Sequence, residues 1–350
     1  METLNECGAG GQLRMRLRDI GEFGLIDLLR SKLNPADHTV VVGIGDDAAV
    51  LAYNAGAHVL LTTDMLVEGV HFRQDIIDFC SLGWKSVAAS LSDIAAMGGT
   101  PRHAVVSLAI PPDAKVDSLE RLYDGMAQIC AEFETHVIGG DIVKTSGPLV
   151  ISVSLTGEVA KGKALLRSGA RPGDLVFVTG HIGGSAAGLA FLENDQKALI
   201  PADEQLELTN YHQRPIPQIT AGKILAASEG CTSCNDISDG LASELNEIAK
   251  ASGVGIHIEE RRLPIAPSVR NFARFSSHCA TNWALYGGED YQLVGTLDPL
   301  RYEEVADQCH LQGIPLTLIG RVTQGSSVLM ETEDGYEVLL QARGYNHFAE

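Results

Sequence analysis

The chain has 350 residues, of which 45% are hydrophobic and 20% are charged, and it carries a formal net charge of −19 at pH 7. The composition excludes a disordered chain, and the length favours two hydrophobic cores over one. The acidic balance excludes a nucleic-acid backbone as the expected partner, because no basic surface is available to release its counterions, but small anionic substrates remain possible if metal ions supply positive charge.

The first residues give no indication of export. Residues 1–20 lack the apolar core of a signal peptide, and we expect them to form a flexible extension. No run of about 18 apolar residues occurs, so we expect no membrane-spanning helix and no membrane partner. The seven cysteines are more typical of the reducing cytoplasm than of a disulfide framework. Cys231 and Cys234 form a lone C-x-x-C without a second ligand pair, so we expect neither a zinc site nor a redox role for them.

Apolar runs that are typical of strands alternate with longer helical patterns along the chain. The segment 81–97 predicts a helix, because Trp84, Val87, Leu91 and Ile94 recur every three or four residues and would form one apolar face. Two glycines directly after this segment would end the helix. Strands are expected, in chain order, at 38–43, 58–63, 104–110, 149–159, 175–179 and 291–296.

The composition changes at 160–174, where a basic stretch with several glycines and a proline leads into a new strand. We therefore expect an N-terminal domain at 21–160 and a C-terminal domain at 161–350. The polar segment 194–215 is expected to form a surface helix and loop. The segment 178–190 reads as a strand, a glycine turn and the start of a helix, whose backbone N–H groups could face an anion or could simply pack closely.

Several carboxylates lie in apolar or glycine-rich surroundings at the ends of strand-like runs, where an unpaired charge is costly. Any one of them, taken alone, is more simply a cap or turn residue. As a group they lack a matching set of buried Lys or Arg, so a hard divalent cation such as Mg²⁺ or Ca²⁺ is the better partner. The group consists of Asp46, Asp47, Asp64, Asp93, Asp141, Asp236, Asp239, Glu289 and Asp290.

Several carboxylates that hold Mg²⁺ around phosphates are typical of phosphoryl transfer. Asp93 would stand beside the apolar face of the helix at 81–97 and could point into a cleft. The two acids of 235–240 would lie on one side if a helix began there, with Ser238 as its cap or as a ligand contact. Arg167 could face a phosphate or lie in a solvated turn.

No P-loop and no protein-kinase motif occurs in the sequence. The residues alone therefore predict an Mg²⁺-dependent enzyme that acts on phosphates.

Taken together and in order, several segments resemble the thiamine-monophosphate kinase family, which shares a superfamily with aminoimidazole ribonucleotide synthetase and selenophosphate synthetase. The resemblance runs from about residue 21 to the C-terminus. It rests on GEFGLI (21–26), GIGDDAAVL (43–51), TTDMLVEGVHF (62–72), SLSDIAAMGGTP (90–101), IGGDIV (138–143), LLRSGARPGDLVFVTG (165–180), SAAGLA (185–190), DISDGLASEL (236–245), GGEDYQL (287–293) and GYNHF (344–348).

The resemblance implies a two-domain aminoimidazole ribonucleotide synthetase-like fold, of the α/β class with mixed sheets. It also implies a cytoplasmic homodimer, in which the N-terminal sheets of two copies pair and the nucleotide site lies near the interface. The reaction would be transfer of the γ-phosphoryl group of ATP to thiamine monophosphate, giving thiamine diphosphate and ADP. The acceptor is already an ionised phosphate oxygen, so direct transfer assisted by several Mg²⁺ ions needs no catalytic side chain.

The resemblance assigns roles to the residues that match the family's motifs. Adjacent residues of an extended chain point to opposite faces, so Asp46 and Asp47 need not bind the same ion. Family members often carry an aromatic residue near the substrate rings where this chain has Ala342, and Tyr345 could take its place. The Mg²⁺ ligands would be Asp47, Asp64, Asp93, Asp141, Asp236 and Asp239, with Thr62, Thr63 and Asp46 near the same ions. ATP would be contacted by Arg167, Ser238, Tyr123 and Gly140, and thiamine monophosphate by His71, Glu289 and Tyr345.

Two other functions remain open on the sequence. Another ATP-using enzyme of the superfamily would keep the acids but would need a different acceptor pocket, and the segments at 62–72 and 287–293 count against it. A non-catalytic protein that binds divalent cations would need no nucleotide, and no repeated calcium-binding loop in the sequence supports that reading.

Overall fold

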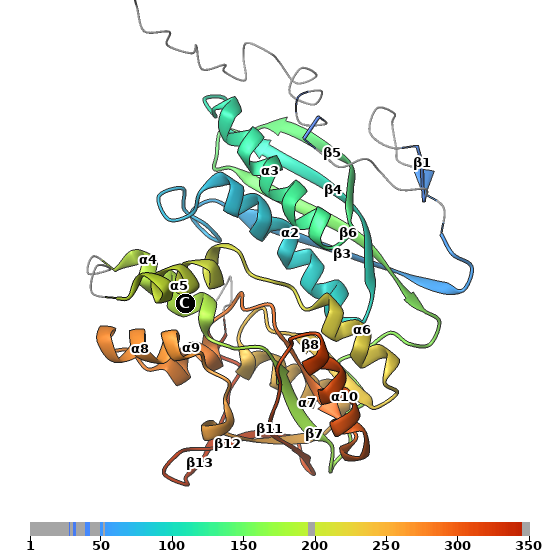
Figure 1. Cartoon of the computed structure of the whole chain (residues 1–350), viewed down its shortest axis with the longest axis vertical. Coiled ribbons are helices and arrows are strands. Elements are labelled where there is room, and N and C mark those ends of the chain that lie inside the picture. Colours follow the sequence, from blue (N-terminus) through green and yellow to red (C-terminus); the bar gives the residue numbers. More distant parts are fainter. Residues whose placement is uncertain are drawn as a thin grey trace, which may run out of the picture.

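The computed structural model describes most of the chain as two large sheets with helices packed against them (Figure 1). None of the described helices is both long enough and apolar enough to cross a membrane. The described residues are Leu28, 31–32, 39–42, 50–51, 53–194 and 200–344. The extension 1–20, the motif at 21–26 and the predicted site residues Asp46, Asp47 and Tyr345 lie outside them.

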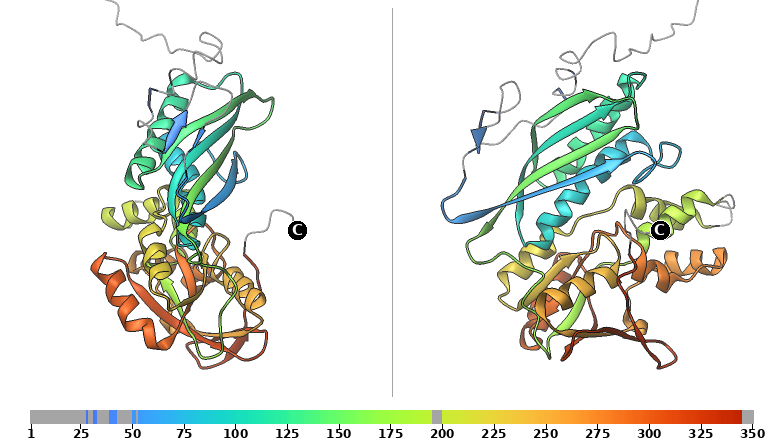
Figure 2. Two further views of the ribbon diagram at one scale, coloured as in Figure 1. Left: turned by 90° about the vertical axis from the view of Figure 1, so that its right-hand side faces the viewer. Right: turned by 180° about the vertical axis from the view of Figure 1, so that it is seen from behind.

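The N-terminal part is built on a four-stranded sheet in the order β3-β6-β4-β5. β4 and β5 are parallel and are connected through α3, whereas β6 runs antiparallel to both of its neighbours. Helices α2 and α3 pack on one face of the sheet (Figure 2). The elements are β3 (Ala57–Val67), α2 (Phe79–Ala96), β4 (Thr100–Ile110), α3 (Val116–Glu132), β5 (His136–Lys144) and β6 (Val150–Ala160), preceded by an antiparallel pair, β1 (Val40–Val42) and β2 (Val50–Leu51).

The two faces of this sheet differ in burial because side chains alternate along each strand. On β6, the side chains of Ile151, Val153 and Leu155 are fully buried in the core with α2 and α3. On the opposite face several hydrophobic side chains remain exposed, and no described helix covers them (Figure 2). These exposed residues are Val59, Leu61, Met65, Val105 and Val143, and we call them the open sheet face.

The C-terminal part is a seven-stranded mixed sheet in the order β13-β12-β9-β11-β7-β10-β8. β12 and β9 are parallel, and the other described pairings in this sheet are antiparallel. The strands are β7 (Leu175–Thr179), β8 (Cys231–Asp236), β9 (Gly255–Glu259), β10 (Leu293–Leu297), β11 (Leu316–Thr323), β12 (Val328–Glu331) and β13 (Glu337–Leu339). The helices are α4 (Gly184–Glu193), α5 (Ala202–Gln213), α6 (Ile219–Ala227), α7 (Leu241–Ser252), α8 (Pro267–Ser276), α9 (Ala280–Tyr286) and α10 (Tyr302–Leu311), with short 3₁₀ turns η2 (Glu260–Arg262) and η3 (Pro299–Arg301).

Helix α2 connects the two parts. It begins after Asp78, whose carboxylate accepts hydrogen bonds from two N–H groups of the first turn. It packs against the N-terminal sheet and also against α5, α6 and β8, which is why nearly all of its side chains are buried. Trp84 donates a 2.8 Å hydrogen bond to the backbone oxygen of Pro215, and a Cβ on Gly222 of α6 would lie 2.1 Å from the Ala95 oxygen. The two parts therefore pack closely against each other along α2, and side chains of this helix lie at their junction.

The main sequence predictions for secondary structure are confirmed. The helix at 81–97 is α2, and the apolar residues that predicted it are buried. The strands predicted at 58–63, 104–110, 149–159, 175–179 and 291–296 correspond to β3, β4, β6, β7 and β10. The segment 194–215 contains α5, but the helix is not only a surface element, because Leu208 and His212 are buried.

Candidate functional site

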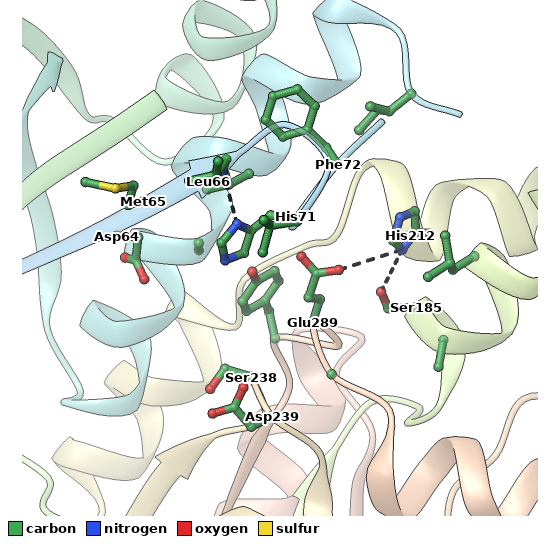
Figure 3. Close-up of a pocket in the computed structure, with 18 of the residues that line it drawn as sticks. Asp64, Met65, Leu66, His71, Phe72, Ser185, His212, Ser238, Asp239 and Glu289 are labelled. Atoms are coloured by element: carbon green, nitrogen blue, oxygen red, sulfur yellow. Dashed lines mark hydrogen bonds and ion pairs between the residues drawn. The ribbon is translucent and has the colours of Figure 1, made fainter. Parts of the chain in front are cut away.

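A cavity of about 890 Å³ lies where β3, α2, α4, β8 and the loop before β10 meet. Figure 3 shows Asp64, Ser238 and Asp239 to one side of the cavity, with His212 and Ser185 to the other. We call the first group, with two further carboxylates, the acidic side: Asp64, Asp93, Asp236, Ser238 and Asp239. We call the second group, with three further residues that line the cavity, the histidine side: His71, Phe72, Ser185, His212 and Glu289.

Three carboxylates from three different elements meet on the acidic side: Asp64 of β3, Asp93 of α2 and Asp236 of β8. Burial raises the pKa of Asp64, and burial together with the charge of Asp64 raises the pKa of Asp93 to about 6. Burial and the charge of Asp93 raise the pKa of Asp236 to about 7. The fully ionised group is therefore costly unless a cation is added.

Each of these carboxylates accepts a hydrogen bond from a hydroxyl group, which fixes one of its oxygens. Ser90 donates to Asp64 Oδ2 at 2.6 Å, Ser92 donates to Asp236 Oδ2 at 2.7 Å, and Thr62 donates to Asp93 Oδ2. Two of the three donors lie on α2, so this helix orients carboxylates of both parts of the molecule. Hydrogen bonds of this kind orient the ligands of metal ions in proteins.

The donor set of the acidic side fits a hard cation, because it consists of carboxylate and hydroxyl oxygens, and because burial and neighbouring negative charge raise the pKa values of Asp93 and Asp236. Among the described residues, no three His, Cys, Asp or Glu side chains are placed to hold a metal ion by themselves. A Mg²⁺ ion does not need such a group, because it typically takes one or two carboxylates and fills its remaining positions with water and substrate phosphates.

The segment after β8 is a loop. No helix begins at its two acids, so the condition under which they would share one side of a helix is not met: β8 ends at Asp236 and α7 begins at Leu241, after a glycine with a φ of 100°. Ser238 and Asp239 of this loop both line the cavity. The N–H of Asp239 donates a 3.1 Å hydrogen bond to Glu244, a buried residue that the sequence analysis did not identify. Burial and the charge of Asp236 raise the pKa of Glu244 to about 8.

The structure does not bring Asp141 to the acidic side. The register across β5, β4, β6 and β3 places Asp141 in one row with Met65, so both point to the open sheet face. Asp64 precedes Met65 and points to the other face, toward α2. Three strand spacings, about 14 Å in total, also separate β5 from β3. Thr63 and Met65 also lie on the open sheet face but line the cavity, so the distance across the strands is what separates Asp141 from it. The Thr63 hydroxyl lies 2.9 Å from that of Ser154.

Of the four predicted ATP contacts, Ser238 alone lines the cavity. Tyr123 is a residue of α3 and is buried in the N-terminal core, and Gly140 lies on β5, where an added Cβ would be 2.0 Å from a backbone oxygen of β4. Close packing of the strands thus accounts for Gly140. Arg167 is outside the cavity lining but near it, and its Nε donates to Asn235 Oδ1 at 3.0 Å. Its positive charge partly offsets the rise in the pKa values of Asp93 and Asp236.

On the histidine side, Glu289 has a buried cationic partner. Lys85 of α2 donates from Nζ to Glu289 Oε2 at 2.8 Å, and the exposed fraction of the Lys85 side chain is 0%. Burial opposes ionisation of Glu289, but Lys85 and then His212 hold its pKa below the usual range. The acids as a group were expected to lack a matching set of buried Lys or Arg, and Lys85 is such a partner for Glu289. The sequence contained a signal, because Lys85 is the only Lys or Arg in α2, an otherwise mainly apolar helix.

The two histidines differ in their contacts. His71 lies in the turn after β3, and its Nδ1 accepts a 3.0 Å hydrogen bond from the N–H of Val67, so it holds the turn as well as lining the cavity. His212 of α5 was not identified from the sequence. Its Nδ1 lies 3.1 Å from the hydroxyl of Ser185, and burial together with the charge of Lys85 lowers its pKa to about 4.

The glycine turn within 178–190 binds one of the chain's own carboxylates. The N–H groups of Gly183 and Ser185 donate to Asp290 Oδ2 and Oδ1 at 2.6 and 2.9 Å. Gly183 is the N-cap residue of α4 and has a φ of 78°, which a glycine adopts without strain. The sequence left open whether these N–H groups face an anion or only pack closely. They bind an acidic group, but it is the carboxyl group of Asp290 and not a phosphate.

Comparisons with known proteins agree with this architecture. Residues 45–159 match the family described as AIR synthase related protein, N-terminal domain, and residues 171–331 match AIR synthase related protein, C-terminal domain. Among curated proteins, the thiamine-monophosphate kinase of Bacillus subtilis (strain 168) is 40% identical over 312 residues, which cover 89% of this chain and 94% of that protein.

Two solved structures are similar over almost their whole length. The thiamine-monophosphate kinase from Stenotrophomonas maltophilia K279a has a TM-score of 0.79 and 33% identity, covering 90% of this chain and 97% of that one. AaThiL complexed with AMPPCP and TMP has a TM-score of 0.74 and 36% identity, covering 96% of this chain and 100% of that one.

Proposed function

The chain belongs to the thiamine-monophosphate kinase family, and we propose that its cavity carries out the family's reaction. That reaction transfers the γ-phosphoryl group of ATP to thiamine monophosphate and gives thiamine diphosphate and ADP. One observation carries the assignment: a single cavity joins a group of mutually destabilised carboxylates to a second side with an anchored carboxylate and a buried neutral histidine. The first side suits a metal-bound polyphosphate, and the second suits a polar heterocycle.

The acidic side would hold Mg²⁺ through Asp64, Asp93, Asp236 and Asp239, with Asp47 as a further candidate outside the described residues. When bound, Mg²⁺ neutralises the phosphate oxygens and stabilises the charge that moves during transfer. Ser90, Ser92 and Thr62 keep the carboxylates in place by hydrogen bonding. The polarity of this side is therefore fixed before substrates arrive, which lowers the cost of reorganisation.

The remaining side chains of the cavity bind and orient the substrates. Ser238 has a hydroxyl available to a phosphate of ATP, and Arg167 lies close enough to add positive charge to the same region. On the histidine side, Glu289 and His71 would contact the acceptor, while Phe72 contributes an apolar surface. The acceptor phosphate oxygen attacks the γ-phosphorus as ADP leaves, so no side chain has to remove a proton or become phosphorylated.

The open sheet face supports a homodimer. Its five hydrophobic side chains lie on β3, β4 and β5 of one sheet, with β6 between β3 and β4, and Leu61 is 76% exposed. Exposed hydrophobic surface of this kind marks a protein–protein interface. Asp141 lies on the same face, so it would stand at or near the interface and away from the acidic side that would hold Mg²⁺. We place the dimer in the cytoplasm, where the thiols that the structure describes as free would remain reduced.

Substrate binding to the cavity can be tested by thermal unfolding with AMPPCP, Mg²⁺ and thiamine monophosphate. Each ligand should raise the unfolding temperature, because ligands that bind only the folded state stabilise it. The nucleotide effect should disappear in excess chelator, and Asp93→Asn should weaken it. Stabilisation by Mg²⁺ alone, with no further effect of either substrate, would favour a non-catalytic cation-binding protein. Stabilisation by the nucleotide, but not by thiamine monophosphate, would favour a superfamily enzyme with another acceptor.

A further inference from the structure

The ion pair of Lys85 and Glu289 joins the two parts of the molecule inside the cavity wall. Lys85 comes from α2 of the N-terminal part, and Glu289 comes from the loop before β10 of the C-terminal part. The Lys85 ammonium has no exposed surface, and a buried ion pair is seldom the most stable choice, because apolar residues of similar volume often stabilise a fold as well or better. The pair therefore calls for a functional reason.

The partners of Glu289 occupy only one of its two oxygens. Lys85 Nζ lies 2.8 Å from Oε2, and His212 Nδ1 lies 3.8 Å from the same atom. Lys85 Nζ is also 3.4 Å from His212 Nε2, and the hydroxyl of Ser185 holds the other ring nitrogen. No described residue hydrogen-bonds to Oε1, and Figure 3 shows this oxygen on the side of His71, within the cavity.

The pairing changes what Glu289 can do for a substrate. A free carboxylate would act as a counter-ion for a cationic ring, but the pair with Lys85 is neutral as a whole. What the pair offers is one hydrogen-bond acceptor with a fixed direction, which recognises N–H groups and rejects groups that cannot donate. Thiamine monophosphate contains such a donor in the amino group of its pyrimidine ring.

We propose that Lys85 is a positioning residue for acceptor recognition: it fixes Glu289 through Oε2, so that Oε1 accepts a hydrogen bond from the pyrimidine amino group of thiamine monophosphate. The inference rests on the proposed function. Lys85 also precedes Asp93 by eight residues on α2, which is about 12 Å along a helix. One rigid helix thus sets the distance between the bound pyrimidine and the acidic side where the phosphates would react.

The test compares Lys85→Met, Glu289→Gln and the double variant in steady-state kinetics, after turnover of thiamine monophosphate by the wild type has been established. Lys85→Met should raise the KM for thiamine monophosphate by about tenfold or more and leave the KM for ATP within about twofold. The double variant should match Glu289→Gln alone, because Lys85 acts through Glu289. The matched control is Lys163→Met, which removes a lysine that pairs with Glu229 on the surface.

A second substrate separates positioning from general damage to the fold. The acceptor analogue in which a carbonyl oxygen replaces the pyrimidine amino group accepts a hydrogen bond at that position but cannot donate one, so it should be a much poorer substrate for the wild type. That preference, as a ratio of kcat/KM values, should fall toward one in both Lys85→Met and Glu289→Gln. Lys85→Arg, which keeps the charge, should retain part of it.

The double variant keeps the test decisive even if Lys85→Met alone fails to fold, because it leaves no unpaired charge in the cavity wall. A double variant whose KM for thiamine monophosphate exceeds that of Glu289→Gln by a further tenfold would overturn the inference. Retention of the full amino-group preference by the Lys85 variants would also overturn it. Absence of wild-type turnover would overturn the proposed function itself, and this outcome is visible before any variant is made.

Discussion

Ser92 of α2 donates a 2.7 Å hydrogen bond to Asp236 of β8, and both side chains are almost completely buried. This contact joins α2 of the N-terminal part to Asp236, a carboxylate that the C-terminal part contributes to the acidic side. The hydrogen bond lowers the pKa of Asp236, against burial and the charge of Asp93, which raise it to about 7. Ser92 therefore helps to keep Asp236 ionised near neutral pH.

Replacing Ser92 by Ala should raise the pKa of Asp236 further, because the ionised carboxylate loses its hydroxyl donor. The Mg²⁺ concentration for half-maximal activity should then increase by about tenfold at pH 6.5 and by less at pH 8, where a larger share of Asp236 is ionised in both proteins. Mg²⁺ titrations of activity at the two pH values measure this. Ser86→Ala is the control, since Ser86 lies buried on the same helix and its hydroxyl donates to the Gly83 oxygen of that helix and, among the described residues, to no carboxylate. An unchanged requirement at pH 6.5 would contradict the role of Ser92.

Asp93→Asn should abolish nearly all turnover and stabilise the metal-free fold. The pKa of Asp93 is raised to about 6, so the folded state disfavours its charge at pH 8, and removing that charge stabilises the fold by up to about 3 kcal/mol. Urea unfolding in chelator at pH 8 checks the stability, and an assay at limiting Mg²⁺ checks the activity. A rate near that of the wild type at limiting Mg²⁺ would exclude Asp93 as a metal ligand.

His212 should make the fold sensitive to acid. Its folded pKa is about 4 against an ordinary 6.5, so between these values the unfolded chain binds a proton that the folded chain excludes. The contribution of His212 to stability is complete above pH 6.5 and is lost as the pH falls toward 4, by about 2 kcal/mol between pH 7.5 and pH 5. His212→Gln should lack this part of the loss. Urea unfolding of both proteins at pH 7.5 and pH 5 measures it, and parallel losses in the two would contradict the assignment.

Leu61→Glu should dissociate the proposed dimer, because it places a charge on the open sheet face at its most exposed hydrophobic residue. Analytical ultracentrifugation across a range of concentrations measures the change. Leu300→Glu is a matched control, since Leu300 is 90% exposed in η3, away from that sheet. A wild-type protein that is monomeric at every concentration, or a variant that dimerises equally well, would rule out this face as the interface.

Periodic patterns made much of the fold predictable. The spacing of Trp84, Val87, Leu91 and Ile94 predicted α2, and runs of β-branched residues predicted five strands of the two sheets. Strands of mixed composition escaped detection: β8 has the sequence CTSCND, in which no apolar run or alternation appears. This strand forms because β10 pairs with it and α2 and α7 pack against it, and this information lies elsewhere in the chain.

The acids were found individually from the sequence, but their grouping was not predictable in full. Asp64 and Asp141 were expected at strand ends, and both lie inside strands, where the pairing register decides the face to which each points. Glu289 and Asp290 are neighbours with different partners, a buried lysine and the N-terminus of α4. These partners are 204 and 107 residues away along the chain, so no local pattern could have assigned them.

The most direct test of the central claim follows the phosphoryl group itself. ATP labelled in its γ-phosphoryl group is incubated with the protein, Mg²⁺ and thiamine monophosphate, and the products are separated by chromatography. We predict labelled thiamine diphosphate and unlabelled ADP in equal amounts, with both absent in excess chelator. Label that appears only in inorganic phosphate or in another acceptor, with no labelled thiamine diphosphate, would contradict the assigned reaction.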